Sequence, residues 1–390
     1  MNNKLRVILK ETALKINMND TIFSIGSCFS NELTKFLNKN GIHILSNPFG
    51  TVYNTQSIYK IFDVILNKNN YKKDDIYYEE NIYFTLEHST KFDSNNLDEC
   101  LEKINKNLLK TKEYFKKANI FIITLGTSVV YLYKDIITAN CHKLPHNLFK
   151  RKILSFNENV ENLKHIINLI KSNNKETKII ISLSPIRHTP QDLIENSYSK
   201  SLLRASIEEI IDNKFIFYFP AFEIVIDELR NYTYYKKDMV HLRDETENYI
   251  LSLFINAYFD DNLKEYINKF KKIRNSLKHK TIYPLSIENF KMLLDVSEKI
   301  IELEKYIKNK LIDKQKEKLI IKLIDNFKDK KNDIDKVLNK LFCKDKNSYN
   351  FFKVILEGNY SELIKMNIDE KILIKYRDKV LLSDLFKKNR

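Results

Sequence analysis

The residue best suited to nucleophilic chemistry near the start of the chain is Cys28, in the segment Gly26-Ser27-Cys28-Phe29. An apolar run precedes this segment and an amphipathic pattern follows it, which predicts a strand that ends here and a helix that begins. The first turn of a helix carries unpaired backbone N–H groups and the positive end of the helix dipole, and both stabilise an anion. A cysteine there can therefore become a nucleophilic thiolate, and the N–H groups can hold an oxyanion. A buried structural cysteine is the alternative, and the segment alone favours it.

A general base is available in the segment Asp238-Met239-Val240-His241, which follows the last expected strand. In a turn, three-residue spacing lets the Asp238 carboxylate accept a hydrogen bond from one ring nitrogen of His241. The other nitrogen then faces outward and can take a proton from a nucleophile. We therefore expect Cys28, His241 and Asp238 to form a catalytic group for ester or acyl chemistry.

Short apolar runs alternate with amphipathic segments along the first 260 residues, and these elements would position the catalytic group. The expected strands are 21–25, 120–125, 178–183 and 215–219, and the expected helices are about 29–40, 96–118, 157–173 and 195–212. This alternation predicts an α/β fold with a mainly parallel sheet and helices on both faces. The irregular stretch 41–92 is expected to form loops with short helices over the sheet.

Glycine is scarce in the chain, with only five residues, so the glycines can mark backbone positions that other residues cannot occupy. Gly26 and Gly126 each follow a predicted strand. In open α/β sheets, ligands bind at the carboxyl ends of the strands. We therefore predict that both glycines lie at this edge, on neighbouring strands.

The pattern changes after His241. The segment Asp244-Glu245-Thr246-Glu247 has the form of a capping box, which predicts the start of a helix. From there to Arg390 the pattern is helical. We expect a catalytic domain at residues 1–279 and a separate helical, lysine-rich domain at residues 280–390.

The net charge of +15 is concentrated in the last third of the chain. Residues 261–390 contain 32 Lys and Arg against 20 Asp and Glu. A basic excess can favour nucleic acid, but these lysines are interleaved with acidic residues at helical spacing, which indicates solvated helix faces. The sequence has no zinc finger and no aromatic RNA-binding motif, so we expect no nucleic-acid partner.

The four cysteines (Cys28, Cys100, Cys141 and Cys343) form no CxxC motif, so the sequence predicts no metal site. Residues 1–20 lack the apolar stretch of a signal peptide. No window reaches the roughly 18 apolar residues that a membrane span needs. These features predict a cytoplasmic protein with reduced cysteines.

Several segments together resemble the GSCFA domain family, a branch related to SGNH/GDSL-type hydrolases. The segment at 26–29 matches the family name, with Ser30 in place of its alanine. The other matching segments occur in the expected order: Asn47-Pro48-Phe49-Gly50-Thr51-Val52-Tyr53-Asn54, Leu125-Gly126-Thr127-Ser128, Asn140-Cys141-His142-Lys143-Leu144-Pro145, Ser184-Pro185-Ile186-Arg187-His188, Asn196-Ser197-Tyr198-Ser199-Lys200 and Asp238-Met239-Val240-His241. The resemblance covers roughly residues 20–260. It implies a flavodoxin-like three-layer sandwich, as in SGNH hydrolases, with its site at the carboxyl edge of the strands.

The resemblance also implies roles for individual residues. When the segment is laid on the Gly-Asp-Ser motif of SGNH hydrolases, Cys28 takes the place of the nucleophilic serine, and Ser27 is the rival nucleophile. Gly50 and Gly126 correspond to the glycines of the next two blocks, which contribute to the oxyanion hole. Ser128 replaces the asparagine that normally donates to the oxyanion, so that donor is in doubt.

Five further residues are candidates for substrate binding. Asn54 or Asn140 could replace the missing oxyanion donor, while a structural role explains Asn140 and His142 equally well. Arg187 follows a strand end and could bind a carboxylate or phosphate, although a salt bridge within a loop explains it nearly as well. His188 follows Arg187 at the same strand end and is the fifth candidate.

Two functions are compatible with the sequence. The first is an enzyme that hydrolyses or transfers an acyl group, on a carbohydrate or similar polar small molecule, without a metal or a bound cofactor. A transferase would need a donor such as acyl-coenzyme A, for which no diagnostic motif occurs. The alternative is an inactive domain that binds a glycan or an anionic ligand. Ser128 favours this alternative, and the Asp238/His241 pair argues against it. The substrate, the choice between hydrolysis and transfer, and the oligomeric state are left open.

Overall fold

The structure is a computed structural model that describes residues 5–9, 12–188, 192–306 and 310–359. The chain forms two compact units, Met1–Lys264 and Glu265–Arg390. The division falls within helix α8 (Asp261–Lys278), earlier than the boundary expected at residue 279. Each unit is described separately below.

A five-stranded parallel sheet forms the centre of the first unit, as the sequence predicts. Its strands are β1 (Ile22–Gly26), β2 (Leu45–Ser46), β5 (Ile120–Leu125), β9 (Lys178–Leu183) and β10 (Ile216–Phe219), in the spatial order β10-β9-β5-β1-β2. This is the flavodoxin-like strand order. Every residue of β1 and β5 is buried, which explains their continuously apolar sequences.

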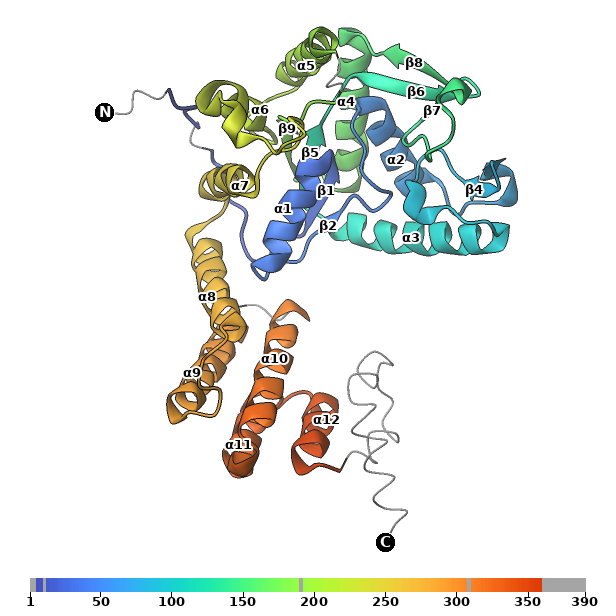
Figure 1. Cartoon of the computed structure of the whole chain (residues 1–390). Coiled ribbons are helices and arrows are strands. Elements are labelled where there is room, and N and C mark those ends of the chain that lie inside the picture. The colour runs from blue at the N-terminus through green and yellow to red at the C-terminus, as the bar shows by residue number, and fades with distance from the viewer. Residues whose placement is uncertain (1–4, 10–11, 189–191, 307–309, 360–390) are drawn as a thin grey trace. The chain divides into compact units, whose positions relative to one another are not determined.

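Helices cover both faces of this sheet, and the three-layer prediction is confirmed (Figure 1). One face packs against α2 (Thr55–Asn67), α3 (Leu97–Lys117), α4 (Phe156–Asn173) and α5 (Leu193–Glu208). The other face packs against α1 (Cys28–Lys39) and α7 (Asp244–Tyr258). Phe219 of β10 shows this second contact, because its ring lies 6.5 Å from that of Phe29 in α1 and 5.1 Å from that of Phe254 in α7.

The predicted loops at 41–92 are only partly present. Residue Asn54 begins a full helix, α2, whose side chains Ile58, Ile61, Phe62 and Ile65 are buried at helical spacing. This stripe is readable in the sequence. The same stretch contains the hairpin of β3 (Tyr77–Glu79) and β4 (Ile82–Phe84).

A second small sheet was also not expected. It is antiparallel and consists of β7 (Ile136–Thr138), β6 (Val129–Tyr133) and β8 (Phe149–Ile153). After β10, the chain forms the short helix α6 (Ala221–Glu223) and a wide helical turn at Ile224–Leu229. Helix α7 begins at Asp244 as predicted, but the predicted capping box is wrong. The N-cap is Arg243, and no side chain caps the helix.

The second unit is helical over its described residues, as predicted. Its elements after α8 are α9 (Ile287–Glu304), α10 (Lys310–Asn326), α11 (Lys331–Leu341) and α12 (Lys346–Glu357). Their apolar stripes are buried together, and lysines pair with acidic residues on neighbouring turns and helices, as Lys269 does with Glu265 and Glu302. Residues 360–390 of the predicted helical domain lie outside the described residues. Across the described helices, none has the length and apolar character needed to cross a bilayer.

Candidate active site at the carboxyl edge of the sheet

The turn that carries Cys28 requires glycine at its first position. Gly26 has a φ of +137°, and a Cβ atom there would lie 2.1 Å from the carbonyl oxygen of Thr124 on the neighbouring strand. Gly26 pairs with Thr124, and Gly126 follows the end of β5, so the two glycines lie at the carboxyl ends of adjacent strands as predicted. Because β1 ends in so tight a turn, α1 starts at Cys28, with Ser27 as its N-cap.

A network of asparagine side chains ties the next loop to this turn. The Gly26 N–H donates to Asn47 Oδ1 at 2.8 Å, and Asn47 Nδ2 donates to Asn31 Oδ1 at 2.8 Å. Asn31, one turn after Cys28 in α1, donates in turn to Thr51 Oγ1 at 3.0 Å. The loop that contains Gly50 and Tyr53 is therefore held beside the N-terminus of α1.

The two rival nucleophiles differ in accessibility. Cys28 is half-buried, and its Sγ lies 3.8 Å from Tyr53 Oη. Ser27 is only 2% exposed, and its hydroxyl has no hydrogen-bond partner among the described residues. Ser27 is the N-cap of α1, but its side chain makes no capping bond to the backbone of the turn. A substrate can reach the thiol more readily than the hydroxyl.

Tyr53 connects three of the predicted segments, although the sequence analysis did not select it. Its carbonyl oxygen accepts hydrogen bonds from the N–H groups of Gly126 at 2.7 Å and Thr127 at 3.0 Å. Its ring lies 4.9 Å from the ring of His188, and its hydroxyl contacts Cys28. Burial, followed by the nearby Cys28, raises the pKa of the Tyr53 hydroxyl, which stays a neutral hydrogen-bond donor at physiological pH. The sequence signal for Tyr53 was its place in a family-like segment.

The N–H and O–H groups of the three residues expected around an oxyanion hole already donate hydrogen bonds to other groups of the protein. The Gly50 N–H donates to the Asn47 carbonyl at 2.9 Å, and the Gly126 N–H donates to Tyr53. The Ser128 hydroxyl is fully buried and donates to the Ser199 carbonyl at 3.1 Å. None of these three groups is therefore free to donate to a ligand in the described structure. Donors beside Cys28 include the N–H groups of Cys28 and Phe29 in the first turn of α1 and the Tyr53 hydroxyl, whereas the Ser30 N–H donates to the Ser27 carbonyl at 2.9 Å.

Asp238 and His241 form the pair that their spacing predicts. His241 Nδ1 lies 2.7 Å from Asp238 Oδ2, while Asp238 Oδ1 accepts from the backbone N–H groups of Val240 and His241 at 2.9 and 3.0 Å. The loop turns tightly because Met239 adopts a φ of +56°. Hydrogen bonds from the Val240 N–H and then from the His241 ring lower the pKa of Asp238 to about 2, so this carboxylate stays ionised and fixes the ring orientation.

Arg187 and His188 connect this loop to the Cys28 region. Arg187 Nη1 donates to the Met239 carbonyl at 2.6 Å, in the middle of the Asp238–His241 loop. The next residue, His188, packs against Tyr53. Burial, and then the charge of Lys200, lower the pKa of His188 to about 4, so it is neutral near pH 7. Arg187 thus positions the His241 loop in addition to any role toward a substrate.

No hydrogen bond joins Cys28 to His241 in the described part of the chain. The recorded partner of the thiol is Tyr53, and that of the His241 ring is Asp238. The approach of the Cys28 thiol to a His241 ring nitrogen within roughly 3–5 Å, which allows for the longer catalytic hydrogen bonds of ligand-free proteins, stays a prediction.

The other predicted residues lie in structural positions. Asn54 is the N-cap of α2, and its side-chain oxygen accepts from the Ser57 N–H at 2.8 Å. Asn140 accepts from the His142 N–H at 2.8 Å in a tight turn after β7. The His142 ring is buried, with its Nδ1 2.9 Å from Asp93 and its face 4.4 Å from the Phe84 ring. These contacts account for all three residues without a substrate.

Lys200 is a second residue that the sequence analysis did not select. Its side chain is buried, and its Nζ donates to the Ser184 carbonyl at 2.6 Å, directly after β9. Burial lowers the pKa of Lys200 to about 7. Perturbed lysines occur at functional sites, and this one lies beneath His188 at the same edge of the sheet. Over the residues that the structure describes, no three His, Cys, Asp or Glu side chains are grouped so that they could hold a metal ion.

Comparison with known proteins identifies the family. The GSCFA family model matches residues 21–254, and the chain belongs to the GSCFA family. Among solved structures, the chain is similar to a carbohydrate esterase of family 3 from Talaromyces cellulolyticus, with 7% identity, a TM-score of 0.32, and coverage of 64% of this chain and 98% of that one. It is also similar to a mutant acetyl esterase with an acetate ion, with 6% identity, a TM-score of 0.30 and the same coverage. No curated protein sequence matches the chain.

Proposed function

We propose that this protein hydrolyses or transfers an acyl group on a carbohydrate or similar polar small molecule, with Cys28 as the nucleophile. One observation carries the proposal. An Asp238–His241 pair whose histidine side chain is 46% exposed occurs in the same unit as a half-buried cysteine at the start of α1. A nucleophile, a base and a group that orients the base are the components that covalent acyl transfer needs.

The reaction has two steps, the acylation of Cys28 and its deacylation. In the first, Cys28 Sγ forms a bond to the carbonyl carbon, His241 Nε2 takes the thiol proton, and the C–O bond of the ester breaks as His241 returns that proton to the leaving oxygen. In the second, His241 deprotonates a water molecule or an acceptor hydroxyl, whose oxygen attacks the thioester carbon. The C–S bond then breaks, and His241 returns the proton to the Cys28 sulfur. Water gives hydrolysis, and an acceptor hydroxyl gives transfer. Acyl-coenzyme A could supply the acyl group in place of an ester.

Two donors are available for the oxyanion in this mechanism. The unpaired N–H groups of the first turn of α1 are the oxyanion donors that the helix-start position of Cys28 predicts. The Tyr53 hydroxyl, 3.8 Å from the thiol, can supply the donor that Ser128 and Gly126 lack. The mechanism requires the Cys28 thiol and His241 Nε2 to come within proton-transfer reach, either directly or through one water molecule.

Turnover of p-nitrophenyl acetate by the full chain and its variants tests the proposal. Cys28→Ala and His241→Ala should each remove almost all activity, since residues that act as one unit are not additive. Ser27→Ala should lower the rate less. Loss of activity in Ser27→Ala with normal activity in Cys28→Ala would show that Ser27, and not Cys28, is the nucleophile.

A binding module without catalysis is the second candidate. The observations that favour it are the buried, fully engaged Ser128 and the lack of a direct bond between Cys28 and His241 in the described residues. If the folded protein turns over no ester or acyl thioester but binds a glycan or an anion, this candidate replaces the enzyme.

A further inference from the structure

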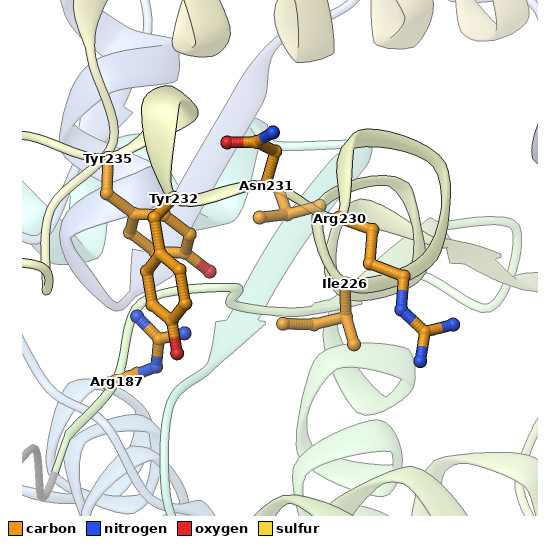
Figure 2. Close-up of a pocket in the computed structure, with 7 residues that line it drawn as sticks. Arg187, Ile226, Arg230, Asn231, Tyr232 and Tyr235 are labelled. Atoms are coloured by element: carbon orange, nitrogen blue, oxygen red, sulfur yellow. The ribbon is translucent and has the colours of Figure 1, made fainter. Parts of the chain in front are cut away.

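A cavity of about 200 Å³ opens beside the Asp238–His241 loop (Figure 2). It lies between the segment after β9, the wide helical turn that follows α6, and the short turn at Tyr232–Tyr234. The residues that line it are Arg187, Val225, Ile226, Arg230, Asn231, Tyr232 and Tyr235. Figure 2 shows Arg187 near the two tyrosine rings and Arg230 on the other side of Ile226.

The two arginines have no carboxylate partner within the described residues. Arg187 is held by its bond to the Met239 carbonyl, and its guanidinium lies 4.4 Å from the centre of the Tyr235 ring and 5.5 Å from that of Tyr232. This fixes a planar cation in the cavity wall with part of its donor capacity unused. Glu228, on the same turn as Ile226, accepts hydrogen bonds from Tyr249 and the Val7 N–H, so its carboxylate is committed elsewhere.

The Tyr235 hydroxyl is an independent indication of a ligand. Tyr235 is only 4% exposed, and its hydroxyl is buried without a hydrogen-bond partner in the described structure. Its backbone is fixed, because its carbonyl accepts from Arg243 Nε at 3.0 Å. Burial raises the pKa of this hydroxyl, so it remains a donor. Buried hydroxyls normally have a partner, and this one belongs to a residue that lines the cavity.

The free polar groups of the lining are mainly donors. The side-chain oxygen of Asn231 already accepts from the Thr233 N–H at 2.8 Å, which leaves its NH₂ group. The cavity wall therefore offers the Arg187 guanidinium, this NH₂ group and, on the other side of Ile226, the Arg230 guanidinium, which together suit a ligand that supplies acceptors and negative charge. The apolar side chains Val225 and Ile226 match the uncharged part of such a ligand.

We propose that this cavity binds a carboxylate or phosphate group of the acyl substrate, so that the enzyme acts on an anionic ester. The proposal rests on the proposed function, because Arg187 joins the cavity to the Asp238–His241 loop through Met239. An anion beside Arg187 would attract its guanidinium, which is bonded to that loop, and would couple substrate binding to the position of His241. A neutral ester lacks this contact.

Binding of inorganic phosphate and of glucuronate to the full chain tests the proposal by isothermal titration calorimetry at low salt. Arg230→Gln should weaken binding at least tenfold and Tyr235→Phe about threefold, while Arg230→Lys, which keeps the charge, should lose less. Lys237→Gln is the matched control. It removes a positive charge from an exposed residue next to Asp238, which does not line the cavity. Tighter binding of one probe identifies the group as phosphate or carboxylate.

Equal affinities in Arg230→Gln and the native chain, or equal losses in Arg230→Gln and Lys237→Gln, would overturn the proposal. The measurement also separates this proposal from the proposed function. Cys28→Ala should bind phosphate as the native chain does while lacking turnover. If the native chain turns over no ester but binds phosphate in a manner that depends on Arg230, the anion site stands and the enzyme proposal fails.

Discussion

Two histidines of the α/β unit have a carboxylate on their Nδ1 atoms, and they differ in the surroundings of the ring. The His241 and Asp238 side chains are 46% and 49% exposed, and the pair occupies a surface loop. The His142 ring is fully buried, its Nε2 has no partner among the described residues, and its partner Asp93 is 12% exposed. The first pair can exchange protons with a substrate, whereas the second is enclosed.

The difference shows that a histidine–carboxylate hydrogen bond does not define a catalytic base. The bond fixes the tautomer and ring orientation in both pairs. Only an accessible Nε2 can then take a proton from a nucleophile. The buried pair instead joins the turn after β7 to the segment after β4, and the tilted contact of the His142 ring with the Phe84 ring indicates a packing role.

The largest expected contrast comes from removing each ring. We expect His241→Ala to lower ester turnover about a thousandfold, the range for loss of a general base, with a change in unfolding free energy within about 0.5 kcal/mol. His142→Ala should destabilise the unit by about 2–4 kcal/mol, because it removes a buried hydrogen bond and ring packing. Turnover and urea unfolding of both variants measure the contrast.

Loss of activity in His142→Ala, without loss of stability, would contradict the different roles assigned to the two histidines. If folded His142→Ala were inactive at native stability, the buried pair would be the functional one. His165→Ala is a suitable control, because His165 lies on α4 and its recorded contact is the Tyr59 ring at 5.1 Å. It should leave turnover unchanged.

Another buried histidine, His88, should make the fold sensitive to acid. It lies beside the buried pair, and burial followed by the charge of His142 lowers the pKa of His88 to about 3. The unfolded chain has a histidine pKa of about 6.5, so between these values the unfolded state binds more protons and stability falls as the pH is lowered. The substitution His88→Asn keeps a hydrogen-bonding atom near Thr85. We expect it to reduce the loss of unfolding free energy between pH 7 and pH 4 by roughly 3 kcal/mol.

Urea unfolding of the native chain and of His88→Asn at pH 4 and pH 7 provides the measurement. An identical pH dependence of both proteins would contradict a buried, neutral His88. His241→Ala, which removes an exposed histidine, serves as the control.

The smallest effect on turnover is expected for a substitution of Tyr53. Its hydroxyl lies next to the Cys28 thiol, and its carbonyl accepts hydrogen bonds from the residues that follow β5. Tyr53→Phe removes the hydroxyl next to Cys28 but keeps the ring against Gly126 and His188 and the carbonyl that accepts from Gly126. We expect turnover to fall about tenfold through the rate constant kcat, with KM little changed, because an oxyanion donor acts mainly in the transition state. A change confined to KM would indicate a substrate-positioning role.

The sequence predicted the parts of this site that depend on local spacing. Asp238 and His241 are three residues apart, and Gly26 and Cys28 sit where a strand gives way to a helix, so both arrangements were readable. The Asp93–His142 and Tyr53–Gly126 contacts join residues far apart in the chain, and only the fold brings them together. The engaged N–H groups of Gly50 and Gly126 were missed for the same reason, since their acceptors are set by tertiary packing.

The Cys28 nucleophile can be tested directly by mass spectrometry. The full chain is mixed with p-nitrophenyl acetate, quenched in acid within the first turnover and digested, and the acetylated residue is identified. We predict a hydroxylamine-sensitive acetyl thioester on Cys28 that forms much faster than any acetylation of Cys343, an exposed cysteine in the helical unit. His241→Ala should slow its formation. An acetyl ester on Ser27, or equal labelling of Cys28 and Cys343, would contradict the account.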